Sequence, residues 1–367
     1  DVWIDESDEA LKEMLDARER VAGTPVTLGK TDIIVNKNGF GALPIQRISF
    51  DDAKVLLRKA YDAGVRFFDT ARFYTDSEEK IGYAMSDIRN HIYITTKTAA
   101  QNAEEFWKDL ETSLTLLKTD HVDVYQFHNP SFCPKPGDES GLYEAALKAR
   151  EQGKIRFIGI TNHRLAVAHE AIDSGLYDTL QFPFCYLCSE KDVELVEDCK
   201  KNNIGFIAMK ALSGGLITNS AAAYAFEDQY DNVLPIWGVQ RENELDEFLS
   251  YMEHPPMMND EIRALIEADR KQLYGSFCRG CGYCMPCPVG IEINNCARMS
   301  LLLRRSPSEG HLSPEGQAKM MKIKDCLHCN QCMSKCPYGL NTPELLQRNL
   351  KDYEEVLAGK VMTPTNF

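Results

Sequence analysis

The chain has 367 residues, 44% of them hydrophobic, which is long enough for one large domain with a full core and a small second domain. Its 41 basic and 55 acidic residues give a formal net charge of −14, which argues against a nucleic-acid or membrane-surface protein, because such proteins carry basic patches. No apolar run approaches the roughly 18 residues of a membrane helix, and no signal peptide is visible.

The first 258 residues predict a short extension followed by a (β/α)8 barrel. Residues 1–25 form the expected extension, with the pattern of an acidic amphipathic helix over 1–22, and the stretch up to about 38 alternates like a hairpin. Eight apolar runs then predict strands at 39–42, 66–70, 92–97, 122–128, 156–162, 180–184, 205–210 and 233–239. Helical patterns lie between them, for example at 50–63, 103–118, 142–152, 192–202 and 242–252. This alternation predicts a TIM barrel over 26–258.

An open doubly wound sheet is the alternative architecture. It requires a glycine-rich phosphate loop after the first strand. Gly39 and Gly41 form only a GxG without the third glycine, so the barrel is favoured.

Four ionisable side chains follow neighbouring strands at the carboxyl-terminal rim, where barrels carry their chemistry. Asp69 ends the second strand, Tyr74 lies in the next loop, and Lys97 and His128 end the third and fourth strands. Singly, these residues could be a helix N-cap, surface packing, a strand-end charge and a core histidine. Together they indicate catalysis. An ammonium group lowers the pKa of a neighbouring phenol, and the tyrosine could then donate its proton to a carbonyl oxygen as hydride reaches the carbon.

Five segments here resemble the aldo-keto reductase family: 67–74, 77–82, 96–97, 124–130 and 159–163. The resemblance extends from about residue 25 to 255. It implies NAD(P)H-dependent reduction of an aldehyde or ketone to an alcohol, or the reverse. Tyr74 would act as acid/base, Asp69 and Lys97 would tune it, and His128 would orient the carbonyl.

The same resemblance implies a nucleotide site. It places Thr161, Asn162 and Gln181 at the nicotinamide carboxamide, Phe184 under the ring, Lys210, Leu212 and Gly214 along the pyrophosphate, and Gly238 and Gln240 at the adenosine phosphate. A plain glycine turn is the alternative for 210–214. Trp237 stands where a lysine is frequent and Arg241 could substitute for it, so the choice between NADP(H) and NAD(H) stays open.

Eight of the 13 cysteines form two runs near the carboxyl terminus. Three thiolates at three-residue spacing wrap one face of a [4Fe-4S] cubane, and the Cys-Pro that ends each run normally ligates the other cluster. We therefore expect two [4Fe-4S] clusters, the first held by Cys278, Cys281, Cys284 and Cys336, the second by Cys326, Cys329, Cys332 and Cys287. The first run closes with two intervening residues instead of three, so the reach of Cys287 is an open point. Zinc usually takes two CxxC pairs across a longer loop, which fits these runs poorly.

The cysteine runs predict a small helical, loop-rich, ferredoxin-like iron–sulfur domain over 276–347. A connecting helix over 259–275 precedes it, a helix at 293–305 lies between the runs, and a tail over 348–367 follows. Free thiols and clusters indicate a reducing cytoplasm in an organism that avoids oxygen. Cys185 and Cys188 are assigned to packing. The whole chain resembles bacterial aldo-keto reductases fused to a ferredoxin-like domain.

Two roles for the clusters remain open. They could relay electrons to a redox partner protein, with Lys319, Lys322, Lys324 and Lys335 as a docking patch or simply as a solvated face. They could instead have a structural role and stabilise a domain whose own hydrophobic core is small. No flavin signature is visible to convert hydride into single electrons. The expected partner is a small carbonyl or alcohol substrate, whose identity the loop at 132–139 does not reveal, and the oligomeric state stays open.

Overall fold

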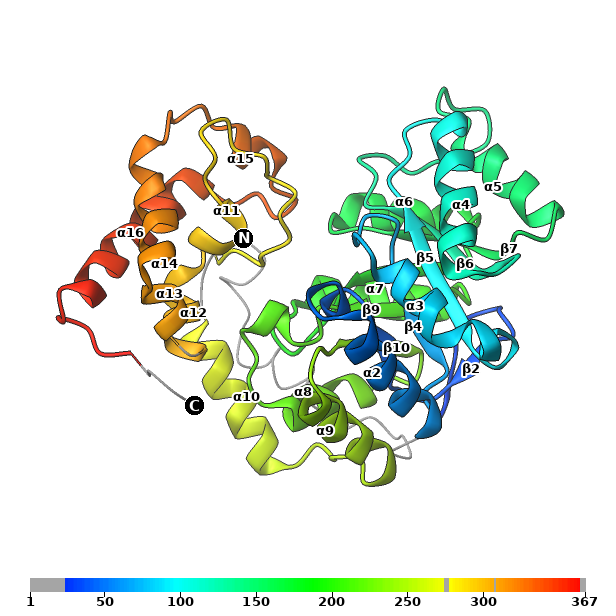
Figure 1. Ribbon diagram of the computed structural model, residues 1–367, viewed down its shortest axis with the longest axis horizontal. Coiled ribbons are helices and arrows are strands. Elements are labelled where there is room, and N and C mark those ends of the chain that lie inside the picture. The colour runs from blue at the N-terminus through cyan, green and yellow to red at the C-terminus, as the bar shows by residue number, and fades with distance from the viewer. Residues whose placement is uncertain (1–23, 274–276, 307, 364–367) are drawn as a thin grey trace. The chain divides into compact units, whose positions relative to one another are not determined.

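The computed structural model describes residues 24–273, 277–306 and 308–363, so the helix expected over 1–22 lies outside the described residues. The described chain divides into two compact units, coloured by residue number in Figure 1. The barrel unit comprises 24–211 and 220–262. The cysteine unit comprises Leu212–Asn219 and the described residues from Arg263 onward. In this division, a loop in the middle of the barrel sequence belongs to the cysteine unit.

The barrel unit is built on a closed barrel of eight parallel strands, as predicted. In order around the barrel, the strands are β3 (Gly39–Gly41), β4 (Phe67–Asp69), β5 (Tyr93–Thr98), β6 (Val122–His128), β7 (Ile155–Thr161), β8 (Thr179–Pro183), β9 (Gly205–Met209) and β10 (Val233–Gly238), with β10 beside β3. Each predicted strand matches an observed strand to within one residue at either end.

Helices connect the strands and bury their apolar faces. They are α2 (Phe50–Asp62), α3 (Ser77–Met85), α4 (Ala103–Leu117), α5 (Leu142–Glu151), α6 (Leu165–Ser174), α7 (Glu190–Lys201), α8 (Ser220–Asp228) and α9 (Glu242–Glu253), with short 3₁₀ turns η1 (Pro44–Arg47), η2 (Ser86–His91) and η3 (Ser213–Gly215). Two of them begin at side-chain caps: Ser49 accepts from the Asp52 N–H, and Asn102 from the Glu105 N–H.

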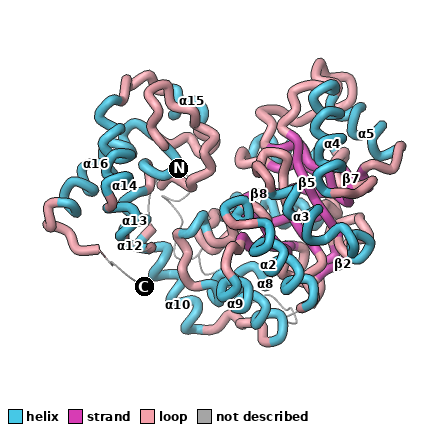
Figure 2. Tube along the Cα trace, viewed as in Figure 1, coloured by secondary structure: helices cyan, strands magenta, loops and turns pink. Residues whose placement is uncertain are grey.

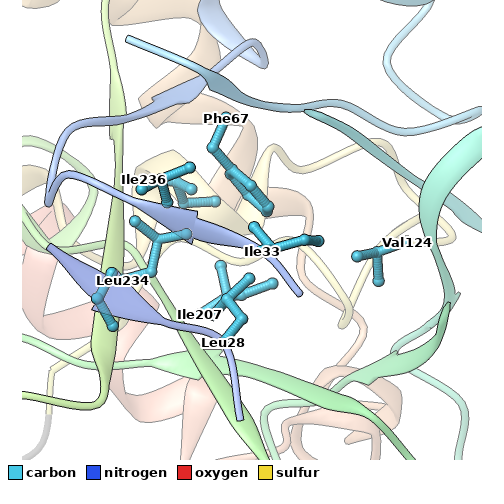
Figure 3. Close-up of a cluster of buried hydrophobic side chains, with 9 residues drawn as sticks. Leu28, Ile33, Phe67, Val124, Ile207, Leu234 and Ile236 are labelled. Carbon is cyan, nitrogen blue, oxygen red and sulfur yellow. The ribbon is translucent and has the colours of Figure 1, made fainter. Parts of the chain in front are cut away.

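A small antiparallel hairpin, β1 (Val26–Thr27) with β2 (Ile34–Val35), confirms the hairpin predicted before the barrel. Its buried side chains, such as Leu28 and Ile33, pack against Phe67, Ile207 and other residues near the amino ends of the strands (Figure 3). An apolar plug therefore occupies the amino end of the barrel, and the polar rim residues lie at the carboxyl end.

The cysteine unit is helical and loop-rich, and its described residues contain no strand (Figure 2). Its helices are α10 (Asp260–Gln272), which begins in the barrel unit, α11 (Ile293–Cys296), α12 (Met299–Arg305), α13 (Glu309–Leu312), α14 (Pro314–Met321), α15 (Gln331–Lys335) and α16 (Thr342–Leu357), with the 3₁₀ turn η4 (Lys322–Asp325). The single helix expected over 293–305 is two helices, because the backbone leaves the helical region at Arg298. In the described part of the chain, none of the helices combines the length and hydropathy that spanning a membrane requires.

Candidate active site

A buried ion pair joins the carboxyl ends of β4 and β5. The Nζ of Lys97 donates to both carboxylate oxygens of Asp69, at 2.8 Å each, and to the carbonyl of Thr70 at 2.7 Å. The two ionised side chains are almost fully buried, with 1% and 2% of each residue exposed. Because an ammonium has three donors, all three are used, and the position of the lysine is fixed.

Tyr74 and His128 lie beside this pair. The Lys97 Nζ is 5.1 Å from the centroid of the Tyr74 ring. The rings of Tyr74 and His128 meet edge to face, with centroids 6.0 Å apart and an interplanar angle of 84°. The structure therefore brings together the four rim residues that the sequence singled out.

The protonation of this group differs from the expectation. Burial raises the pKa of Tyr74 well above its ordinary value, and the charge of Asp69 raises it further. The expected lowering of this pKa by Lys97 is wrong, because the ammonium is neutralised by its two contacts with Asp69. Burial, assisted by the charge of Lys97, lowers the pKa of His128 to about 3. At neutral pH the phenol and the imidazole are both uncharged.

Burial acts on the ion pair in the same manner: it lowers the pKa of Lys97 and raises that of Asp69, while the attraction between the two opposes both shifts. Each charge is therefore maintained by its partner.

A glutamine that the sequence analysis missed supports the rim from below. Gln126, on β6, donates from Nε2 to the Oε1 of Gln181 at 2.8 Å and to the Oγ1 of Thr95 at 3.0 Å. Gln181 in turn hydrogen-bonds Asp69 and helps to keep its pKa down. A side chain at Gly159 would collide with this layer, since its Cβ would lie 2.3 Å from the Oγ1 of Thr179. The available signal was an amide side chain at a central position of a strand predicted to be buried.

Thr161 and Asn162 tie together the loops after β6 and β7. The Oγ1 of Thr161 accepts from the Asn129 N–H at 3.0 Å, and the Nδ2 of Asn162 donates to the Pro130 carbonyl at 2.9 Å. One amide N–H of Asn162 remains available, since the Nδ2 group carries two. The buried Oδ1 of Asn129 has no donor within the described part of the chain. The Oδ1 of Asn129 is thus an acceptor and the Nδ2 of Asn162 a donor, and the two together suit a carboxamide group.

A second buried carboxylate, also missed, orders the loop after β4. Glu78 is 1% exposed, accepts from the Oγ1 of Thr96 at 2.9 Å and forms an ion pair with Arg72. It anchors α3 to β5 beside the loop that carries Tyr74. Arg72 and Glu78 both lie in the segments that carry the family resemblance, which was the signal for them.

Phe184, which the resemblance places under the nicotinamide ring, is a buried aromatic residue. It is 1% exposed and packs among aromatic rings, with its centroid 5.0 Å from that of Tyr230 and 5.3 Å from that of Phe226. Phe226 lies on α8 and Tyr230 follows it, and the sequence pattern does not show either contact. Trp237 is also a packing residue, stacked on Phe248 at 4.6 Å.

The expected phosphate-binding residues lie on loops after β9 and β10. Lys210 has φ of 56°, and Gly214 has φ of 63° within η3, so both occupy left-handed backbone. Lys210 belongs to the barrel unit, whereas Leu212 and Gly214 belong to the cysteine unit. Gly238, the last residue of β10, is exposed. Gln240 accepts from the Nη1 of Arg47 at 3.5 Å, so Arg47 joins Arg241 as a cation near this loop.

The first set of cysteines is gathered in the cysteine unit. Burial raises the pKa of Cys278 and Cys284, and the charges of Cys281 and Cys336 raise both further. Four soft thiolates beside the guanidinium of Arg298 are a donor set that suits an iron–sulfur cluster. Arg298 adds a buried Nε that has no acceptor in the described residues, and a cluster sulfur would supply one.

The second set lines one cavity. Its wall includes Cys287, Cys326, Cys329 and Cys332, together with Cys284 and apolar side chains such as Ile291 and Leu346. Cys287 thus lies on the same cavity as the second run. Within the described residues, no three acidic, histidine or cysteine side chains converge as ligands of a single ion.

Three of the four lysines named near the second run form ion pairs with carboxylates. Lys319 pairs with Glu292 and Glu315, at 3.3 and 3.2 Å. Lys322 pairs with Asp325 at 3.0 Å, and Lys324 pairs with Glu354 at 2.7 Å. The structure therefore favours a solvated, charge-balanced face over a basic docking surface.

Comparison with known proteins gives two family matches: residues 37–222 match the aldo/keto reductase family, and residues 277–341 match the 4Fe-4S dicluster domain. L-galactose dehydrogenase of Arabidopsis thaliana is 29% identical over 211 residues, which cover 52% of this chain and 66% of that protein. Methylglyoxal reductase DkgB of Salmonella typhi is 36% identical over 134 residues, which cover 34% of this chain and 48% of that protein. The chain thus spans less than two thirds of the length of these two relatives.

Solved structures show the same fold. An aldo-keto reductase from Klebsiella pneumoniae in complex with NADPH matches with a TM-score of 0.58 at 20% identity, covering 70% of this chain and 96% of that one. An aldo-keto reductase from Bacillus halodurans in its holo form matches with a TM-score of 0.58 at 18% identity, covering 67% and 96%. Because the family match spans just over half of the sequence and the chain closes into the same barrel, the chain belongs to the aldo/keto reductase family and carries a 4Fe-4S dicluster domain after the barrel.

Proposed function

We propose that the protein is an oxidoreductase that interconverts a carbonyl compound and an alcohol with NADP(H) or NAD(H), and that it carries two [4Fe-4S] clusters. The observation that carries the proposal is the buried Lys97–Asp69 pair beneath Tyr74, with His128 against the tyrosine ring. Such an arrangement fixes one neutral phenol at the rim next to a neutral imidazole. It is suited to moving a single proton.

Each of the four rim residues has its own role in the proposed carbonyl reduction. Tyr74 donates its proton to the carbonyl oxygen of the substrate, and its raised pKa keeps it protonated until that oxygen becomes basic. Neutral His128 contributes a hydrogen bond that orients the same oxygen. Lys97 lies 5.1 Å from the centroid of the Tyr74 ring and forms, with Asp69, the buried pair that holds the tyrosine in position.

The nicotinamide nucleotide, when bound, supplies or accepts the hydride. Thr161, Asn162 and Gln181 are the residues that would hold its carboxamide, and the unsatisfied Oδ1 of Asn129 offers an additional acceptor for the amide N–H. We leave Phe184 out of this site because it is buried among other rings.

The clusters, when bound, would store and transfer single electrons. The proposed ligands are Cys278, Cys281, Cys284 and Cys336 for the first, and Cys326, Cys329, Cys332 and Cys287 for the second. A reducing compartment such as the cytoplasm of an anaerobe would suit the thiolates.

The test replaces Tyr74 by phenylalanine. Tyr74→Phe should lower kcat for carbonyl reduction by at least about 100-fold, the usual contribution of a proton donor, and leave the Kd for nucleotide unchanged. Tyr83→Phe is the matched control, because Tyr83 lies on the surface of α3 and hydrogen-bonds Asp51. A Tyr74→Phe enzyme that retains most of its activity would remove the catalytic assignment.

Electron transfer is the second candidate, favoured by the exposure of the second cysteine run. Cys329 is exposed, and Leu327 and Met333 beside it are 65% and 40% exposed. Anaerobic addition of NADPH or NADH, with and without a panel of aldehydes and ketones, separates the two functions. Carbonyl-dependent nicotinamide oxidation with unbleached clusters supports the reductase. Bleaching by nicotinamide alone supports the relay.

A further inference from the structure

Two arginines flanking α12 hold the loop Leu212–Asn219, which follows β9 but belongs to the cysteine unit. Arg298, just before the helix, donates from Nη1 to the carbonyl of Gly214 at 3.0 Å. Arg305, the last residue of the helix, donates to the carbonyl of Leu216 at 2.6 Å and to Asp269 at 2.8 Å. The loop is therefore positioned by α12.

The guanidinium of Arg298 also touches the first cysteine run. The Cβ of any other residue at position 280 would lie 2.6 Å from the Cζ of Arg298, so Gly280 allows the close approach. Cys278 and Cys281, on either side of Gly280, are near enough for their thiolates to interact with the arginine charge. The buried Nε has no acceptor among the described residues.

Arg298 thus stands between two groups that compete for its donors. One is the carbonyl of Gly214, and the other is the thiolate set of the first run. A guanidinium is a rigid plane with five N–H groups, so a shift toward one side weakens its hydrogen bonds on the other.

We propose that Arg298 is a positioning residue that couples the oxidation state of the cluster at the first cysteine run to nucleotide binding at the loop Leu212–Asn219. The inference rests on the proposed function and on the resemblance, which places Leu212 and Gly214 along the pyrophosphate of the nucleotide. When an external one-electron donor reduces the cluster, one negative charge is added beside Arg298 and no bond is formed or broken. The arginine is drawn toward the cluster, and its hold on Gly214 weakens.

The sign of the coupling follows from this competition. Reduced protein binds the nucleotide diphosphate more weakly than oxidised protein. By reciprocity, a bound nucleotide makes the cluster harder to reduce and lowers its midpoint potential.

The experiment uses the full-length protein loaded with clusters, under anaerobic conditions. The probes are ADP-ribose and its 2′-phosphate, which carry the diphosphate but have no nicotinamide ring to exchange hydride. Calorimetry gives Kd for the oxidised and the dithionite-reduced protein, and an EPR-monitored titration gives the midpoint potentials with and without probe. We expect at least about fivefold weaker binding after reduction, which corresponds to a potential about 40 mV lower at 59 mV per tenfold change.

Two variants assign the coupling. Arg298→Gln should bind the probe equally in both oxidation states. Arg304→Gln removes the same charge from the same helix, where Arg304 pairs with Asp352 at 2.7 Å, and should retain the full difference. If Arg298→Gln takes up less iron and sulfide, Gly214→Ala tests the same contact from the loop, since its Cβ would lie 2.8 Å from the Nη1 of Arg298.

The outcomes are distinguishable. Probe binding that is equal in both oxidation states of the unsubstituted protein overturns the coupling and leaves the proposed function intact. Failure of the oxidised protein to bind either probe overturns the nucleotide assignment, and the coupling with it. A difference that persists in Arg298→Gln overturns the role of Arg298.

Discussion

The barrel rim and the two cysteine runs both gather ionisable side chains, but they neutralise them differently. At the rim, Lys97 and Asp69 satisfy each other, and Gln181 and Gln126 continue the network into the barrel. In the first set of cysteines, like groups face like groups, and the charges of Cys278, Cys281 and Cys336 raise the pKa of Cys284. The Lys97–Asp69 pair is neutral by itself, whereas the one guanidinium of Arg298 cannot balance the four thiolates of the first set.

The secondary-structure elements that carry the two regions also differ. The rim residues are attached to eight strands hydrogen-bonded in a closed ring. Most of the cysteines lie in loops, with only a five-residue helix, α15, inside the second run. We therefore expect the geometry of the rim to survive without ligands and that of the cysteine runs to depend on cluster ligation.

Of the changes considered, removal of the clusters should have the largest effect, and it should affect the cysteine runs but not the barrel. Anaerobic chelation should abolish hydrogen-exchange protection at 277–292 and 326–341, because the thiolates repel one another once the clusters are gone. Protection of the barrel strands should be unchanged. Mass-spectrometric exchange of the loaded and stripped protein measures both regions at once.

The same experiment could also contradict the expected dependence of the cysteine runs on the clusters. Stripped protein that keeps its protection in both cysteine runs would show that their buried side chains, such as Leu303 and Tyr353, are a sufficient core. The clusters would then be left to electron transfer.

The next largest effect is expected at the buried ion pair. Lys97→Met should lower the free energy of unfolding of the barrel by about 3–5 kcal/mol, because Asp69 is left as an unpaired buried charge. The double variant Lys97→Met with Asp69→Leu should regain most of this stability, since no charge remains, yet stay inactive. Urea unfolding followed by tryptophan fluorescence measures both variants. A single variant as stable as the unsubstituted protein would show that the pair is not stabilised by mutual neutralisation.

Much of the fold and of the rim could be predicted because both depend on local pattern. Strand ends follow from apolar runs, and a barrel places those ends on one rim, so Asp69, Tyr74, Lys97 and His128 could be grouped from the sequence. The cysteine spacing likewise indicated two thiolate sets, and the cavity that includes Cys287 supports their assignment.

The remaining features depend on contacts between distant segments. The burial of Phe184 depends on α8, and the pKa of Tyr74 depends on how closely Asp69 neutralises Lys97. No spacing in the sequence shows either effect. The assignment of Leu212–Asn219 to the cysteine unit depends on Arg298 and Arg305, more than 80 residues away along the chain.

A moderate effect on the free energy of unfolding is expected when the pH is lowered. The pKa of His128 is lowered to about 3 from the usual 6.5, so below pH 6.5 the unfolded chain binds a proton that the folded barrel does not. Stability is therefore lost as the pH falls from about 6.5 toward 3, by about 2 kcal/mol at pH 5. His128→Gln should flatten this slope in urea titrations, while the control His169→Gln, at an exposed histidine, should not. Equal slopes in all three proteins would mean that His128 is accessible to protons.

The smallest effect is expected at the charged surface of the cysteine unit. Lys324 and Glu354 form an exposed pair, and such pairs contribute about 0–1 kcal/mol because water screens both charges. Lys324→Ala should therefore leave the urea midpoint and the cluster potentials unchanged. It should also leave the salt dependence of cluster reduction by an acidic electron donor unchanged, since Glu354 already balances the lysine. Stopped-flow reduction at several ionic strengths measures this. A lower salt dependence in Lys324→Ala would show that a partner displaces Glu354 and that this face is a docking surface after all.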